Sequence, residues 1–170
     1  MDQPLVNRVA NSSLKTINLE DFFPKEAIVP FDIKHYLFME MIIKEKDFRQ
    51  AMKAHDWSQY RGQILTVFCS VEAIIPSWAY MLIATYTADI VKDVYMGSKS
   101  DYLDYYYTQK IRSMDISAYQ NEKVVVKGCS KKPVPTSAYF ELTKVLTPIA
   151  SSIMYGEPCS TVPIYKKKKA

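Results

Sequence analysis

Three cysteines, each followed directly by a serine, are the residues of this chain with the most distinctive chemistry. They are Cys69, Cys129 and Cys159. Thiolates are ligands of soft metals, and three of them with one open position suit zinc or an iron–sulfur cluster. His55, Asp56, solvent or a substrate would fill the fourth position. Since the spacing contains no Cys-x-x-Cys pair, small buried thiols at strand ends are the competing interpretation.

A second set of residues has the composition of an anion pocket. It consists of Ser130, Lys131, Lys132, Thr136 and Ser137. Backbone amides at the start of a helix attract anions, and ammonium groups and hydroxyls add to this attraction. The lysines also favour the thiolate form of Cys129, which would make it a nucleophile. A loop whose lysines are merely solvated is the alternative.

No sequence motif assigns a reaction to these residues. The chain lacks a Gly-x-Ser-x-Gly elbow, and its four glycines cannot supply a phosphate-binding loop or a dinucleotide-binding pattern. Whether the protein is an enzyme therefore stays open at the level of sequence.

An internal repeat determines where the candidate residues lie. Residues 56–60 (DWSQY) match residues 115–119 (DISAY) at an offset of 59 positions. A Pro-x-x-Ala-Tyr pattern that begins at Pro76 recurs at Pro135, at the same offset. We infer that the chain contains a duplicated unit.

The same offset relates Gly62 to Asn121, and these two residue types readily take a positive φ angle in a tight turn. The duplication therefore predicts the same turn in both halves. We treat the whole chain as one domain with an N-terminal segment, two repeat halves and a C-terminal loop with a basic tail. These parts are residues 1–39, 40–98, 99–157 and 158–170.

Each half is expected to fold in the order helix, turn, strand, loop, helix, strand. The first helix of each half is expected over residues 33–54, with Asp32 as N-cap, and over residues 100–113. The second helix of each half is expected to begin at Pro76 and at Pro135. The expected strands span residues 64–68, 91–96, 124–127 and 153–155. Two further strands, residues 14–19 and 27–31, are expected to pair with each other at an edge. This alternation predicts an α/β fold with a mainly parallel sheet, right-handed crossovers and helices on both faces.

The predicted topology gathers the cysteines at one place. Strand ends that precede crossover helices lie at one edge of a parallel sheet, where ligands bind. Cys69 and Cys129 follow their strands directly, and Cys159 comes three residues after Gly156. We therefore expect all three thiols at the carboxyl edge of a single sheet.

Charge and hydropathy bear on the class of partner. The chain of 170 residues has a net charge of +4, and lysines occupy all of residues 166–169. Without that run the body is about neutral, so nucleic acid is not an expected partner. The most apolar run, residues 78–91, contains polar residues and is too short to cross a bilayer. We expect residues 165–170 to be a mobile tail that could dock on an acidic surface.

The cysteine count bears on the compartment. The first residues, Met-Asp-Gln-Pro-Leu, lack the basic-then-apolar order of a secretory signal. An odd number of cysteines in such a chain indicates free thiols in a reducing cytoplasm. A homo-oligomer is compatible with the sequence, which does not fix the oligomeric state.

The two segments around the later cysteines, residues 126–135 (VKGCSKKPVP) and 154–163 (MYGEPCSTVP), resemble a bacterial family known as domain of unknown function 2480. Residues 6–12 (VNRVANS), 46–49 (KDFR) and 55–58 (HDWS) are also similar to that family. The resemblance spans nearly the whole chain. It implies a compact cytoplasmic bacterial protein and assigns no activity.

Two functions are therefore expected as alternatives. The first is a small cytoplasmic protein with a thiolate metal or cluster site made by Cys69, Cys129 and Cys159, with His55 as a further candidate ligand. The second is a non-catalytic binding module that holds an anionic ligand or partner through the loop at residues 130–132 and the basic tail.

Overall fold

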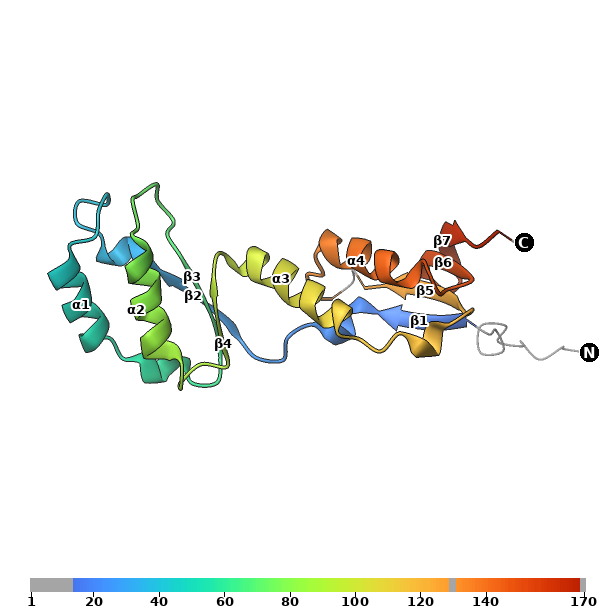
Figure 1. Ribbon diagram of the computed structural model, residues 1–170, viewed down its shortest axis with the longest axis horizontal. Coiled ribbons are helices and arrows are strands. Elements are labelled where there is room, and N and C mark those ends of the chain that lie inside the picture. The colour runs from blue at the N-terminus through green and yellow to red at the C-terminus, as the bar shows by residue number, and fades with distance from the viewer. Residues whose placement is uncertain (1–13, 129–130, 169–170) are drawn as a thin grey trace, which may run out of the picture. The chain divides into compact units, whose positions relative to one another are not determined.

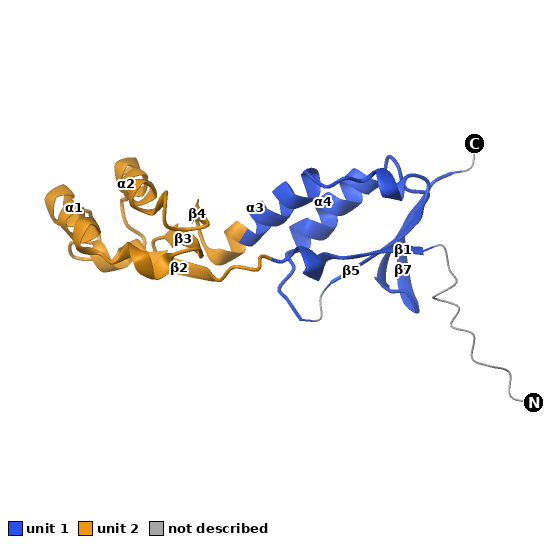
Figure 2. Cartoon of the chain, turned by 90° about the horizontal axis from the view of Figure 1, so that it is seen from below, with its two compact units in different colours: residues 1–23, 103–170 blue, residues 24–102 orange. Residues whose placement is uncertain are grey.

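The computed structural model describes residues 14–128 and 131–168 of the chain (Figure 1). The chain divides into two compact units, which Figure 2 shows in different colours. Unit 1 comprises residues 1–23 and 103–170, and unit 2 comprises residues 24–102. Unit 2 is therefore inserted, in sequence, between the first strand of unit 1 and the remainder of that unit.

Unit 2 contains a three-stranded parallel sheet of order β2-β3-β4. Its strands are β2 (Ile28–Asp32), β3 (Ile64–Phe68) and β4 (Asp93–Met96), and its helices are α1 (Glu45–Ala54) and α2 (Ser77–Thr87). Both crossovers step in the same direction across the sheet, so right-handed connections place α1 and α2 on the same face (Figures 1 and 2). Phe48 and Met52 of α1, Leu65 and Val67 of β3 and Ile83 of α2 form the buried core between these layers.

Unit 1 contains a four-stranded sheet of order β1-β5-β6-β7. Its strands are β1 (Leu14–Asn18), β5 (Lys123–Lys127), β6 (Ser152–Glu157) and β7 (Ser160–Lys166), and its helices are α4 (Thr136–Leu146) and most of α3 (Lys99–Arg112). The first three strands are parallel, and β7 returns antiparallel to β6. Figures 1 and 2 show α3 and α4 over the same face of this sheet.

The two units repeat one strand register. In unit 2 the pairing of β2 with β3 begins at Ile28 and Ile64, and that of β3 with β4 begins at Ile64 and Asp93. In unit 1 the matching pairs are Leu14 with Lys123 and Lys123 with Ser152. Since Lys123 and Ser152 lie 59 positions after Ile64 and Asp93, the sheets follow the repeat residue by residue.

The turn before each central strand repeats as well. Gly62 has a φ angle of 70° and Asn121 one of 59°, as the sequence predicts. The amide of Gly62 donates to the carbonyl of Ile90 at 2.9 Å, and the amide of Asn121 donates to the carbonyl of Ile149 at 2.8 Å. The matched registers and turns confirm the internal duplication.

The α/β class and the predominance of parallel pairing are confirmed, but the prediction of one continuous sheet is wrong. The strands belong to two sheets, one in each unit. The N-terminal strands do lie at edges, yet β1 pairs with β5 and β2 pairs with β3, so they do not pair with each other. The reason is that each repeat half supplies two parallel strands, and one N-terminal strand adds a third parallel strand to each pair. Helices were also expected on both faces of the sheet, but within each unit both helices lie on the same face (Figures 1 and 2).

The predicted helix over residues 33–54 is interrupted. A 3-10 helix covers Ile33–Tyr36, and Asp32 caps it by accepting a hydrogen bond from the Lys34 amide at 2.9 Å. The chain then makes a tight turn, with the φ angles of Met39 and Glu40 at 51° and 56°, before α1 begins. Pairing of Phe38 with Ile42 across this turn takes the place of helical hydrogen bonds.

The prediction of a mobile C-terminal tail is wrong for its first part. Tyr165 pairs with Ile153, and Lys166 pairs with Ser152, within the sheet of unit 1. The amide of Lys167 also donates to the carbonyl of Ser151 at 2.9 Å. Residues 169–170 lie outside the described residues. None of the described helices has the length and apolar character that crossing a membrane requires.

Candidate functional site

The three cysteines do not follow strands of a single sheet, so that part of the metal-site argument is wrong. Cys69 follows β3 of unit 2, is half-buried and lines a cavity of about 450 Å³ together with Glu72, Tyr80 and other residues of that unit. Cys159 lies in the turn between β6 and β7 of unit 1 and is exposed. Cys129 lies outside the described residues. Both described cysteines are free thiols.

His55 lies in an aromatic cluster of unit 2. Its Nδ1 atom is 3.1 Å from the hydroxyl of Tyr36, and its Nε2 atom is 3.2 Å from the hydroxyl of Tyr60. The ring also packs edge-on against Phe31 and Trp57. Burial lowers the pKa of His55, although the nearby Asp56 carboxylate opposes this effect. Because both ring nitrogens already contact hydroxyls, the imidazole serves the packing of this cluster.

In the described part of the chain, no group of three His, Cys, Asp or Glu side chains is arranged to hold a metal ion. A complete thiolate site of the predicted kind would need Cys129, which is not described. The predicted ligand set therefore stays a prediction.

The predicted anion loop is bound by a carboxylate of the chain itself. One oxygen of Glu20 accepts hydrogen bonds from the amides of Lys131 at 2.7 Å and Lys132 at 3.4 Å. Glu20 is buried, with 8% of its surface exposed. The chain comes close here because Gly128 has no side chain: a Cβ atom would stand 3.0 Å from the amide nitrogen of Leu19. The amides of Lys131 and Lys132 are thus satisfied without an external anion.

A similar hydrogen bond between an amide and a carboxylate holds the corresponding loop of unit 2. The Asp32 carboxylate accepts a hydrogen bond from the amide of Ser70 at 3.1 Å, as well as the capping bond described above. Burial alone would raise the pKa of Asp32, but the hydrogen bonds from Ser70 and Lys34 lower it. In both units, therefore, an acidic side chain near the N-terminal strand fixes the loop that follows the central strand.

The side chains of the predicted anion site have separate surroundings where the structure describes them. Ser130 is outside the described residues. The hydroxyl of Ser137 donates to the carboxylate of Asp104, and Thr136 lines a groove along α4. Lys131 and Lys132 are exposed, and the Lys132 ammonium lies 5.3 Å from the centre of the Phe23 ring.

A cavity with a volume of about 780 Å³ lies in unit 1. We call it the α4 groove. Its lining residues come from β5, α4 and the loop before it, β6 and β7: Val126, Val134, Thr136, Tyr139, Phe140, Thr143, Lys144, Ile153, Met154, Tyr155 and Ile164. Phe140 and Ile164 are large apolar side chains that are 72% and 52% exposed. The groove thus presents apolar and aromatic side chains together with a few hydroxyls and one ammonium group.

An irregularity in the sheet shapes one wall of this groove. Ile153 pairs with Tyr165, but the next residue, Met154, pairs with Pro163, so Ile164 has no partner on β6. Such a bulge redirects side chains locally. Ile164, the extra residue of β7, lines the groove together with Ile153 and Met154 of β6.

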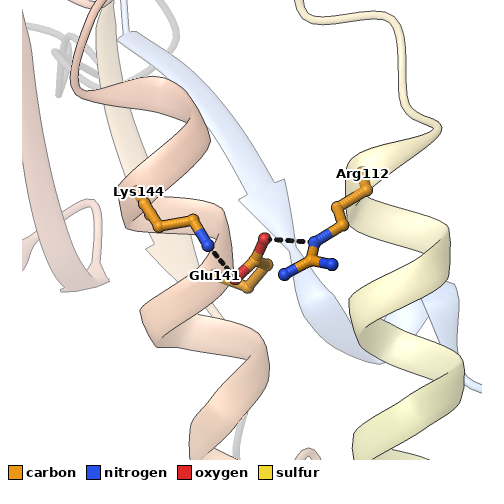
Figure 3. A network of polar contacts seen from close by, with 3 residues as sticks. All are labelled: Arg112, Glu141 and Lys144. Atoms are coloured by element: carbon orange, nitrogen blue, oxygen red, sulfur yellow. Dashed lines mark hydrogen bonds and ion pairs between the residues drawn. The ribbon is translucent and has the colours of Figure 1, made fainter.

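Charged side chains from α3 and α4 meet in a triad (Figure 3), and one of them, Lys144, lines the groove. The carboxylate of Glu141 accepts hydrogen bonds from Arg112 at 2.7 Å and from Lys144 at 2.7 Å. Glu141 is only 6% exposed, whereas the side chains of Arg112 and Lys144 are 57% and 54% exposed. Hydrogen bonds from Arg112 and Lys144 lower the pKa of Glu141, so it is ionised at neutral pH. This triad carries one positive charge in excess.

Unit 2 does not repeat the triad. At the offset of 59 positions, Leu82 corresponds to Glu141 and Thr85 corresponds to Lys144. The groove and the triad were not among the predicted sites, because each triad residue is an ordinary helical residue by itself. The available signal was this difference between halves, in which a carboxylate stands where the other copy has an apolar residue.

Comparisons with known proteins concern the whole chain. No curated protein and no solved structure shows significant similarity to it. A family model described as "Protein of unknown function (DUF2480)" matches residues 3–167. Since this match covers nearly the entire chain, the protein belongs to that family.

Proposed function

We propose that the protein is a binding module that takes a small apolar ligand into the α4 groove of unit 1. The observation that carries the proposal is the groove itself. Its volume of about 780 Å³ falls within the roughly 300–1,000 Å³ typical of small-molecule sites. Its lining, mainly apolar and aromatic with a few polar groups, is also typical of such sites.

Exposed apolar side chains at the groove support the same proposal. Phe140 and Ile164 leave apolar surface in water, and a ligand would cover this surface. The bulge at Ile164 adds a further apolar wall. A second copy of the chain could cover the same side chains, so the test must separate a ligand from a dimer.

The test uses an uncharged fluorescent probe, N-phenylnaphthylamine, titrated into the purified full-length protein. We expect saturable binding by the wild type and at least about tenfold weaker binding by Phe140→Asp, because the new carboxylate would stand in the apolar groove. Met81→Asp is the matched control, because Met81 occupies the equivalent position of unit 2 and is similarly exposed, at 67%. This control should bind the probe as the wild type does.

Three results would overturn the proposal. The first is the absence of saturable probe binding, and the second is an equal loss of binding in both variants. The third is a dimeric wild type, measured by light scattering, that Phe140→Asp converts to a monomer, because the groove would then be an interface between copies.

A thiolate site remains a second candidate, which we propose in a narrower form. It is supported by the parallel pairing of β5 with β6, because the segments that follow these strands leave the same edge of one sheet. Cys129 and Cys159 belong to those segments, and Cys69 does not. Stoichiometric zinc or iron in untagged protein, lost in Cys159→Ser, would support this site; metal-free protein isolated from metal-supplemented cells would refute it.

We also propose that the protein works in the bacterial cytoplasm. The free thiols of Cys69 and Cys159 support a reducing compartment. Fractionation of a bacterial host that carries the gene natively would test the location, and recovery of the protein outside the cytoplasm would contradict it.

A further inference from the structure

We propose that the ligand of the α4 groove is an amphipathic carboxylate, whose apolar chain fills the groove and whose head group binds the Lys144 ammonium. This inference rests on the proposed function and specifies its ligand class. It starts from the position of Lys144, which both lines the groove and belongs to the charged triad.

The charge beside the groove is not balanced. Glu141 carries one negative charge and contacts two cations, Arg112 and Lys144, so one positive charge lacks a counter-charge within the triad. A carboxylate ligand supplies a single negative charge and would balance it. A phosphate monoester carries nearly two charges at neutral pH, which exceeds what the triad can balance.

Packing of the fold does not require this charge. The position of Glu141 on α4 is filled by Leu82 on the equivalent helix of unit 2, where no carboxylate is present. A buried ion pair is weak support for stability, because desolvation offsets the attraction between its charges. Ligand binding therefore explains the presence of Glu141, Arg112 and Lys144 better than stability of the fold does.

Lys144 is the more mobile partner of Glu141. Its side chain is 54% exposed, so water can solvate the ammonium group when it leaves the carboxylate. Arg112 stays on Glu141 through its own hydrogen bond of 2.7 Å, so the buried carboxylate would keep a cationic partner. The Lys144 ammonium is then free to donate to a ligand carboxylate in the groove, whose lining also includes Thr136 and Thr143.

The experiment compares three probes with the same chain length: decanoate, decanol and decyl phosphate. Their affinities are measured by calorimetry on the full-length wild type and on Lys144→Thr, which copies Thr85 of unit 2. Lys110→Thr, which removes an exposed lysine of α3, is the charge-matched control. We expect decanoate to bind the wild type about tenfold more tightly than decanol, and Lys144→Thr to abolish this difference while Lys110→Thr preserves it.

Each other outcome contradicts the proposal in a distinct way. Equal affinity of the wild type for decanoate and decanol would refute the carboxylate head group while leaving the groove as a binding site. Tighter binding of decyl phosphate through Lys144 would assign a different ligand class. Loss of decanoate preference in a Lys131→Thr/Lys132→Thr variant instead of Lys144→Thr would assign the anion to the loop. Failure of all three probes to bind would refute the proposed function as well.

Discussion

Acidic side chains near the N-terminal strands perform a task that composition alone does not reveal. Glu20 accepts hydrogen bonds from the amides of Lys131 and Lys132, and Asp32 accepts one from the amide of Ser70. These carboxylates pair with loop amides that have no partner within a helix or a strand ladder. The loop at residues 130–132 was predicted to bind an external anion. Instead, the Glu20 carboxylate of the same chain binds the amides of Lys131 and Lys132.

His55 illustrates how one residue couples packing to pH. Its ring lies between the hydroxyls of Tyr36 and Tyr60, and burial lowers its pKa below the ordinary value of 6.5. Burial also raises the pKa of both tyrosines. The unfolded chain therefore binds a proton at His55 at a higher pH than the folded chain does.

We expect the free energy of unfolding to fall as the pH drops below about 6.5, because protonation of His55 favours the unfolded state. Stability should be fully present above that pH. Urea unfolding between about pH 5.5 and 7.5, a range above carboxylate titration, measures this slope. His55→Gln should flatten the slope, whereas His35→Gln, which removes an exposed imidazole, should keep it. Identical slopes in all three proteins would show that His55 does not contribute.

At the scale of elements, the β6–β7 hairpin distinguishes unit 1 from unit 2. It adds a fourth, antiparallel strand to the repeated parallel core, and its bulge forms part of the α4 groove. The hairpin depends on Gly156, which has a φ angle of 119°. A Cβ atom at this position would stand 2.7 Å from the backbone oxygen of Ser160, closer than Cβ atoms come to other heavy atoms.

Gly156→Ala should therefore destabilise the protein by about 3 kcal/mol or more, through backbone strain and this clash. Gly62→Asn is the matched control, because Asn121 makes the same turn in unit 1 and a Cβ atom at Gly62 meets no atom within 4 Å. Its cost should stay below about 1 kcal/mol. Chemical denaturation gives both values. A mild effect of Gly156→Ala would mean that the hairpin can shift without loss.

The molecule as a whole is a duplication in which one unit is inserted into the other. Unit 1 consists of two chain segments, residues 1–23 and 103–170, whereas unit 2 is the continuous segment 24–102. Unit 2 has its own buried core, which includes Phe31, Phe48 and Leu65. A continuous segment with its own core satisfies the ordinary requirements for folding by itself.

The isolated segment 24–102 should therefore fold cooperatively, with dispersed amide signals by nuclear magnetic resonance and a sigmoidal urea transition. Phe48→Ala in this fragment, which empties the centre of the core, should cost about 3–5 kcal/mol or prevent folding. Glu45→Ala on the exposed face of the same helix is the control. A fragment without cooperative unfolding would show that unit 2 depends on unit 1.

Part of the site could be anticipated from single residues and part could not. Free thiols, the turn at Gly62 and Asn121 and the cap at Asp32 are local properties, because each depends on a residue and its immediate neighbours. The triad of Arg112, Glu141 and Lys144 joins two helices, so no local pattern identifies it. The α4 groove likewise requires knowledge of which strands adjoin α4.

The sequence by itself determined the type and order of the repeated elements and the duplication, because hydrophobic pattern, proline and glycine act over a few residues. It also determined the equivalence of the two registers, which follows from the constant offset of 59 positions. Only the tertiary structure decided how the strands divide between sheets. Leu14 pairs with Lys123, although all of unit 2 lies between these residues in the sequence. Ile28 pairs with Ile64. Both N-terminal strands have only five residues, so their partners depend on long-range packing that neighbouring residues do not encode.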